Sequence, residues 1–207
     1  MGVAGVLIAG VPLGAERDLT AEARIRRAAL ELFAARGYDG TTTRAIAARA
    51  GVSPGLVLHH FGTKERLRDR VDQDVVATVD ELFARMAPVG GGVEYEVWLT
   101  GFRRLFEDQP DVTAYLRRGL LEQSATVRGL FDKVIDFADG FHRAFIEAGV
   151  ARVPNDHRAT VAVLAGMSLT AVLLGPHVER YLGAGEPIET RLARATLELM
   201  RHGTFEH

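Results

Sequence analysis

The sequence predicts an all-α protein, and three observations support this class. Apolar side chains recur at helical spacing, residues that cap helices precede the apolar runs, and no alternating apolar–polar stretch of useful length is present. With 207 residues, of which 47% are hydrophobic and 25% charged, the chain is long enough to bury a core. The absence of cysteine excludes disulfides, thiolate metal sites and cysteine nucleophiles, and it fits a cytoplasmic location.

The first residues are apolar but do not form a membrane signal. The segment MGVAGVLIAGVPLG lacks the basic region of a secretory signal and is too short to span a bilayer. We expect residues 1–17 to be a disordered tail or to result from a mis-assigned start. The most apolar later run, residues 159–175, is short and flanked by charges, so no membrane contact is expected.

The first predicted helix covers residues 21–36. Thr20 is suited to cap its first turn, and Gly37 is suited to end it. One buried stripe is predicted from Ile25, Ala28, Ala29, Leu32 and Phe33.

Three further helices follow at short intervals. A short helix lies within residues 41–51, where a threonine caps it and Gly51 stops it. Ser53 caps the next helix, and Pro54 takes its first position, where the missing N–H costs nothing. The fourth helix runs over about residues 63–87.

The run PVGGGV at residues 88–93 is the clearest break in the chain. Its glycines and proline indicate a flexible loop between helices. The remaining predicted helices are at about 94–108, 111–122, 125–148, 155–174 and 188–202.

Residues 41–61 meet the physical requirements of a helix-turn-helix. Ala47 is small enough to let two helices cross closely, Gly51 tolerates the positive φ of the turn, and Val57 fills the gap between the helices. Each feature is common alone, but together at this spacing they are moderately specific. A plain β-turn at residues 53–55 is the alternative.

The segment from Arg24 to Leu67 resembles the DNA-binding domain of TetR-family (TetR/AcrR-like) repressors. The similarity lies in GYDGTT after the first helix, the turn IAARAGVS, the ending HHF and the start KE of the fourth helix. It implies a three-helix helix-turn-helix DNA-binding domain over residues 18–66. A helical effector-binding and dimerisation domain would follow over residues 67–207, which match the family only in being helical.

The resemblance also implies roles for individual residues, with the third helix in the major groove of DNA. Thr42 and Arg44 before this helix, and Lys64 after it, are expected to contact phosphates. The leading edge and groove-facing end of the helix would be Ser53, Pro54, Gly55, Leu56, Leu58, His59 and His60. Val57 and Phe61 would instead belong to the helix-turn-helix core.

The adjacent histidines His59 and His60 leave several functions open. Neighbours on a helix project about 100° apart, so the pair lacks the same-face spacing that helical metal sites favour. A contact with phosphate or sugar is favoured, while simple packing and a metal or catalytic role are the alternatives. Because few side chains here can form bidentate base contacts, affinity is expected mainly from phosphates, with specificity shared with DNA shape.

The charge distribution agrees with a DNA-binding first domain. Residues 15–70 carry 11 Lys and Arg against 7 Asp and Glu, although the whole chain has a net charge of −2. The rest of the chain is therefore acidic. A basic front suggests that only this part approaches a polyanion, though an excess of four charges alone is weak support.

The rest of the chain is assigned by resemblance to dimerisation and effector binding. The last two long helices would form the dimer interface, because residues 159–175 are apolar on most faces and must be buried on more than one side. A role purely as internal core is the alternative. The candidate effector-pocket residues are Trp98, Phe102, Tyr115, Arg118, Phe137, Phe141 and His142.

Together these features predict a homodimeric transcriptional regulator, most simply a repressor that an unknown small-molecule effector releases from a palindromic operator in double-stranded DNA. An architectural DNA-binding protein without effector is the alternative. A helical-bundle metalloenzyme is disfavoured, because residues 139–142 hold a single Asp-x-x-His motif. We expect no catalytic residue, metal or cofactor, and the sequence identifies neither effector nor operator.

Overall fold

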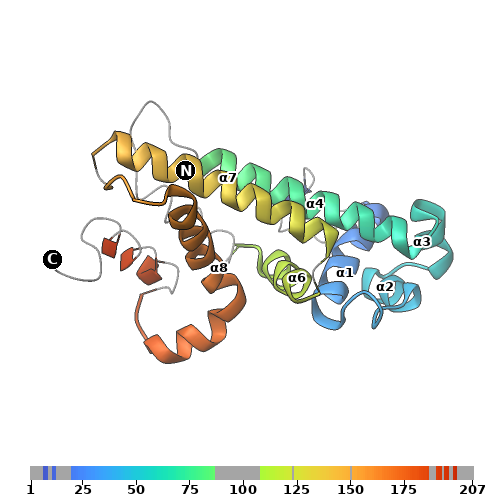
Figure 1. Ribbon diagram of the computed structural model, residues 1–207. Coiled ribbons are helices and arrows are strands. Elements are labelled where there is room, and N and C mark those ends of the chain that lie inside the picture. The colour runs from blue at the N-terminus through green and yellow to red at the C-terminus, as the bar shows by residue number, and fades with distance from the viewer. Residues whose placement is uncertain are drawn as a thin grey trace, which may run out of the picture. The chain divides into compact units, whose positions relative to one another are not determined.

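The computed structural model shows two compact units built almost entirely of helices (Figure 1). The described residues are 7–8, 11–12, 20–86, 108–122, 124–149, 151–186, 190–192, 194–195 and 198–199. Within them, the strands β1 (Leu7–Ile8) and β2 (Val11–Pro12) form one short antiparallel pair, and every other regular element is a helix. The all-α prediction is therefore confirmed. The rest of the predicted 1–17 tail lies outside the described residues.

Unit 1 begins with four helices whose ends follow from their capping residues. α1 (Ala21–Arg36) starts after Thr20, whose hydroxyl accepts from the amide of Ala23, and it ends at Gly37 with φ 76°. α2 (Thr43–Ala50) and α3 (Pro54–Phe61) follow, and α4 (Lys64–Met86) belongs to unit 1 as far as Glu81. Each of these helices was predicted within one or two residues.

The core of unit 1 is formed by the apolar faces of these helices. Its most buried large side chains include Ile25 and Phe33 of α1, Ile46 of α2, Val57 of α3 and Leu67 of α4. Burying such side chains is worth about 1.5–3 kcal/mol each relative to exposure to water. α1, α2 and α3 thus form one small cluster of helices (Figure 1).

A buried ion pair adds a polar contact to this core. Arg26 of α1 donates to both carboxylate oxygens of Asp74 on α4, at 3.0 and 2.8 Å, and both side chains are largely buried. Burial raises the pKa of Asp74, although the Arg26 guanidinium opposes that rise. Arg26 is therefore committed to the interior of unit 1.

Unit 1 also contains α6 (Pro110–Leu121), which packs against α1. Arg118 donates to the carbonyls of Ala34 and Ala35 at 2.9 and 3.1 Å, and so satisfies acceptors at the end of α1. Tyr115 donates to Asp72 of α4 at 2.5 Å. The helix-turn-helix is thus supported by a helix from much later in the chain.

Unit 2 contains α7 (Ala125–Glu147) from Val127 onward and α8 (His157–Leu182), together with the end of α4. Asp156 caps α8 by accepting from the amide of Ala159 at 3.0 Å. Phe83 of α4 stacks on Phe137 of α7 with ring centroids 4.6 Å apart. The aromatic row continues along α7 through Phe141 and Phe145.

The helices after residue 94 agree only in part with the sequence prediction. α8 continues to Leu182, so the predicted end at residue 174 was wrong. The helix ends at Gly183, whose φ of 72° is a conformation that favours glycine. The predicted helix 94–108 lies almost wholly outside the described residues. The described residues of 188–202 are helical.

Candidate nucleic-acid interface

The turn between α2 and α3 is fixed by three local features. Thr42 caps α2 by accepting from the amide of Ala45 at 3.1 Å. Gly51 ends α2 in the left-handed region, with φ 66° and ψ 39°, where a glycine has no Cβ penalty. Ser53 accepts from the amide of Leu56 at 3.2 Å and caps α3, so the chain reverses direction within a few residues.

The two faces of α3 differ sharply in burial. Val57 is 2% exposed and Phe61 is 9% exposed, and Ala47 of α2 is buried as well. Leu58, by contrast, is 50% exposed. The exposed residues of α3 and its cap are Ser53, Pro54, Gly55, Leu58, His59 and His60, with Leu56 half-buried. A short helix therefore presents one whole face to solvent beside a packed face.

The histidine pair lies on this exposed face. The rings of His59 and His60 are 5.6 Å apart at an angle of 70°, and the ring of His60 lies 6.2 Å from that of Phe61. Among the described residues, no group of three or more His, Cys, Asp or Glu side chains is placed to hold a metal ion. The pair is available as hydrogen-bond donors at the surface.

Lys64, at the start of α4, is held by an aromatic side chain that the sequence pattern did not single out. Its Nζ lies 3.9 Å from the ring centroid of Tyr38, and the guanidinium carbon of Arg68 lies 4.9 Å from the same centroid. The Tyr38 hydroxyl donates to Glu65 Oε1 at 2.7 Å. Lys64 and Arg68 thus both lie against the Tyr38 ring, and cation–π interactions stabilise this arrangement.

The ionisation of this cluster follows from its contacts. Burial and the bond to Glu65 raise the pKa of Tyr38 to about 12, so its hydroxyl stays a donor at neutral pH. The Tyr38 hydroxyl in turn lowers the pKa of the Glu65 carboxyl. The only sequence signal for this cluster was an aromatic residue in GYDG, which does not reveal its partners.

Side chains suited to bind phosphate lie at the starts of α2 and α4, the helices before and after α3. Thr42 and Arg44 lie at the start of α2 and are exposed there, where free amide groups and the helix dipole favour an anion. Lys64 lies at the start of α4. Groups that can bind phosphate therefore lie before and after α3, with the exposed surface of α3 between them.

Comparison with known proteins identifies the family. A family model described as "Bacterial regulatory proteins, tetR family" matches residues 25–71. The chain is 38% identical over 148 residues to the HTH-type transcriptional regulatory protein RaaS of Mycobacterium tuberculosis strain H37Rv, which covers 72% of this chain and 68% of that protein. The chain belongs to the TetR family.

Other relatives agree with this assignment. The HTH-type transcriptional repressor Rv3405c of Mycobacterium tuberculosis strain H37Rv is 41% identical over 78 residues, covering 38% of this chain and 40% of that protein. A TetR-like transcriptional regulator from Rhodococcus sp. RHA1 superposes with a TM-score of 0.68 over 87% of this chain and 93% of that structure. At 21% identity this last likeness shows the fold alone. TetR-family proteins are helix-turn-helix regulators that bind DNA operators and act as dimers.

The predicted effector-pocket residues of this TetR-family protein fall in different places. Trp98 and Phe102 lie outside the described residues. Tyr115 and Arg118 belong to unit 1, where their polar groups bond to Asp72 and to the end of α1. The remaining candidates, Phe137, Phe141 and His142, lie on α7 in unit 2.

His142 is a buried polar side chain with one ring nitrogen to which the described residues form no hydrogen bond. It is 3% exposed, and its Nδ1 has no hydrogen-bond partner among the described residues. Its ring stacks on that of His157 at 5.3 Å, and His157 Nε2 makes a short contact with Asp139 Oδ1. Burial and the neighbouring His157 lower the pKa of His142, which favours a neutral imidazole in the folded protein. Arg143 and His157 lower the pKa of Asp139.

No helix among the described residues has both the length and the apolar character needed to cross a bilayer.

Proposed function

We propose that the protein is a dimeric repressor that reads a palindromic operator with α3 and leaves it when a small molecule binds unit 2. The observation that carries this proposal is that α3 has one buried face and one exposed face. Val57 and Phe61 fix the helix to its domain. Leu58, His59 and His60 stay exposed between the residues proposed to bind phosphate. A helix held in this way is what entry into a major groove requires.

The contacts with DNA are of two kinds. Thr42, Arg44 and Lys64 would meet phosphates on either side of the groove, and His59 or His60 would donate to phosphate or sugar. Leu56 and Leu58 are suited to touch thymine methyl groups, and Gly55 permits close approach of the backbone. Sequence preference would then come from apolar contacts and DNA shape rather than from bidentate hydrogen bonds.

The partner in the dimer would be a second copy seated on α8. Val163 and Leu174 are 61% and 50% exposed, and Tyr181 is 88% exposed. With Gly166 and Thr170 between them, these residues recur at helical spacing and form one stripe. Exposed apolar stripes of this kind mark protein–protein contacts. A dimer would place two α3 helices about one DNA turn, roughly 34–36 Å, apart.

Release from DNA requires an effector that favours a different state of the dimer. We place its site in unit 2, near the aromatic row of α7 and the unpartnered Nδ1 of His142. An effector shifts the equilibrium only by the difference in its affinity for the two states. The DNA-reading domain, which we assign to residues 18–66, would respond through α4, which continues from that domain as one helix to Met86.

A gel shift of the purified protein tests the proposal. The probe is the DNA immediately upstream of its own gene, compared with random DNA of equal length at physiological salt. Specific retention supports a repressor with a local operator. No retention of either DNA, even at low salt, would contradict the proposed function.

Lys64→Ala tests the phosphate contact within the same assay. It should weaken binding to all sequences alike and reduce the salt dependence by about 0.9 for each phosphate that the variant no longer neutralises. Lys133→Ala on α7 removes the same charge from unit 2 and is the matched control. An unchanged slope for Lys64→Ala would remove Lys64 from the interface.

A further inference from the structure

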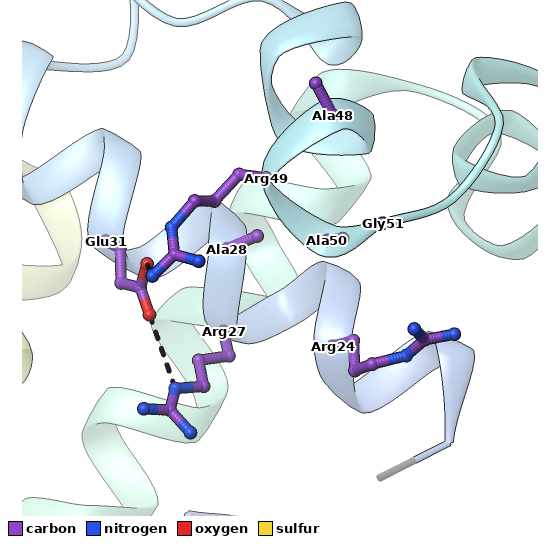
Figure 2. Close-up of a pocket in the computed structure, with 8 residues that line it drawn as sticks. All are labelled: Arg24, Arg27, Ala28, Glu31, Ala48, Arg49, Ala50 and Gly51. Atoms are coloured by element: carbon purple, nitrogen blue, oxygen red, sulfur yellow. Dashed lines mark hydrogen bonds and ion pairs between the residues drawn. The ribbon is translucent and has the colours of Figure 1, made fainter. Parts of the chain in front are cut away.

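A pocket of about 250 Å³ lies between α1 and α2, apart from the face of α3 described above (Figure 2). Its charged walls are Arg24, Arg27 and Glu31 of α1 and Arg49 of α2. Alanines and Gly51 supply the rest of the lining, so small side chains leave the space open. The volume is below the roughly 300–1,000 Å³ of ordinary small-molecule sites, which suits a single small group rather than a drug-sized ligand.

The pocket carries more positive charge than its one carboxylate neutralises. Glu31 binds Arg27 through Oε1 at 3.3 Å and Arg49 through Oε2 at 2.7 Å. Figure 2 shows these two arginines on either side of the Glu31 carboxylate, with Arg24 directed away from it. Three guanidinium groups against one carboxylate leave two positive charges in excess.

Arg24 is the group without a counter-charge. No described residue forms a hydrogen bond or ion pair with its side chain, and its Nε is buried with no partner. Its Nη1 lies 3.8 Å from the position that a Cβ on Gly51 would take. A buried donor without a partner costs free energy, and an anion at this end of the pocket would remove that cost.

We propose that this pocket binds a phosphate group, with Arg24 as its principal ligand. The planar guanidinium presents paired N–H donors that match phosphate oxygens. Binding at the Arg24 end keeps the anion away from the carboxylate of Glu31. Residues 21–24 form the first turn of α1, where the helix dipole favours an anion, while Thr20 already accepts from the amides of Ala23 and Arg24.

The phosphate comes from the DNA backbone. Gly51 is the turn residue two positions before Ser53, the cap of α3, so the pocket adjoins the entry to the groove-reading helix. This contact would be separate from the one proposed for Thr42 and Arg44, which lie at the other end of α2. This source rests on the proposed function, whereas the pocket's affinity for phosphate does not.

The DNA arm of the test measures salt dependence. Full-length wild type and Arg24→Ala are titrated with a random-sequence duplex over a range of salt, because phosphate contacts do not depend on sequence. Arg24→Ala should make the slope shallower by about 0.9 per phosphate, hence by about two in a dimer. Arg158→Ala on α8 removes the same charge from unit 2 and should leave the slope unchanged.

Arg24→Lys separates the effect of the planar, forked guanidinium from the effect of its positive charge. Lysine keeps the charge near the C-terminal end of α2 but has no fork, so it should keep the wild-type slope and bind DNA less tightly at each salt concentration. If Arg24 serves only to balance the end of α2, both variants bind DNA with the wild-type slope and the wild-type affinity, and the DNA source is overturned. Arg24→Lys also keeps the test valid should Arg24→Ala fail to fold by circular dichroism.

The second arm uses inorganic phosphate against sodium chloride at equal ionic strength. A rise in the melting temperature of wild type but not of Arg24→Ala shows that the pocket binds free phosphate. If Arg24→Ala leaves the salt dependence of DNA binding unchanged, this result means that the pocket is a phosphate site whose ligand is a free phosphate and not the DNA backbone. If the protein binds no DNA at all, the proposed function fails while this arm still tests the pocket. No effect in either arm overturns the proposal.

Discussion

Tyr38 determines where the ammonium group of Lys64 can lie. The ring is 3.9 Å from Nζ, and the bond to Glu65 holds the ring in place. We predict that Tyr38→Leu weakens DNA binding by about two- to fivefold, since an exposed cation–π contact is worth about 0.5–1 kcal/mol. Tyr38→Phe keeps the ring and should retain most of the affinity. Fluorescence anisotropy with a labelled duplex measures both variants.

The comparison of the two variants separates the ring from the hydroxyl. If Tyr38→Phe loses as much affinity as Tyr38→Leu, the bond to Glu65 rather than the ring positions Lys64. If neither variant changes affinity, Lys64 does not depend on Tyr38. Both proteins should first show wild-type unfolding curves.

His142 makes the stability of unit 2 depend on pH. Its pKa in the folded protein lies below the ordinary value of 6.5, so the unfolded chain takes up a proton first as the pH falls. Proton uptake by the unfolded state lowers the free energy of unfolding, and the loss sets in below about pH 6.5. Asp139 opposes the lowering, while His157 and Arg143 reinforce it.

We therefore predict that His142→Phe loses less stability than wild type between about pH 7.5 and about pH 5.5. Urea unfolding at the two pH values measures the difference. His59→Gln, which replaces an exposed histidine in unit 1, should keep the wild-type pH dependence. An equal loss in His142→Phe and wild type would mean that His142 does not cause it.

At the scale of residues, the sequence predicted which side chains are buried better than it predicted which residues they contact. The helical period separates Val57 from Leu58, and the structure has one buried and the other exposed. The contact of Tyr38 with Lys64 was not predictable, because it joins residues on different elements and depends on how those elements pack. Which of the exposed residues touch DNA stays a prediction.

The turn between α2 and α3 depends on the backbone of Gly51 more than on its surroundings. A Cβ there would meet only Arg24 Nη1 at 3.8 Å, an ordinary contact, but φ 66° is a conformation that residues with a Cβ rarely adopt. We predict that Gly51→Ala lowers the free energy of unfolding by about 1–2 kcal/mol. Gly55→Ala, in a helix with ordinary φ, should raise it by up to about 1 kcal/mol.

This pair of glycines provides its own control, because both substitutions add one methyl group within the same motif. Denaturant unfolding of the two variants measures the contrast. If Gly51→Ala is as stable as wild type, the turn does not need the left-handed conformation. Gly55→Ala should nevertheless bind DNA less tightly if the backbone of α3 approaches the groove closely.

At the scale of elements, the helix ends marked by strong caps were predictable, while the end of α8 was not. Thr20, Ser53 and Gly37 mark ends that the structure reproduces. α8 passes through Gly175 and ends only at Gly183, which has a positive φ. A glycine in a helix interior costs only about 1 kcal/mol relative to alanine, so its position alone does not fix the end of a helix.

The arrangement of whole units was the least predictable feature. Val112 and Leu116 give α6 an apolar face, but such a face does not specify which helix it covers. In the structure α6 packs on α1, so unit 1 combines the helix-turn-helix with a segment from residues 108–126. Arg118, which we expected in an effector pocket, bonds instead to the end of α1, and any part it takes in a pocket stays untested.

The dimer proposed for this molecule depends on the exposed stripe of α8. Leu174 is 50% exposed on that stripe, and a carboxylate there would have to be desolvated in a helix–helix interface. We predict that Leu174→Glu converts the dimer to a monomer and roughly halves the salt slope for DNA, because a monomer contacts one half-site only.

Light scattering after size exclusion gives the mass, and Leu121→Glu is the matched control. Leu121 is 76% exposed at the end of α6 in unit 1, so the same substitution there should leave the dimer intact. A Leu174→Glu protein that remains dimeric would exclude this face of α8 as the interface. A monomer that keeps the wild-type salt slope would show that dimerisation is not what joins the two half-sites, and the operator would then be read by single subunits.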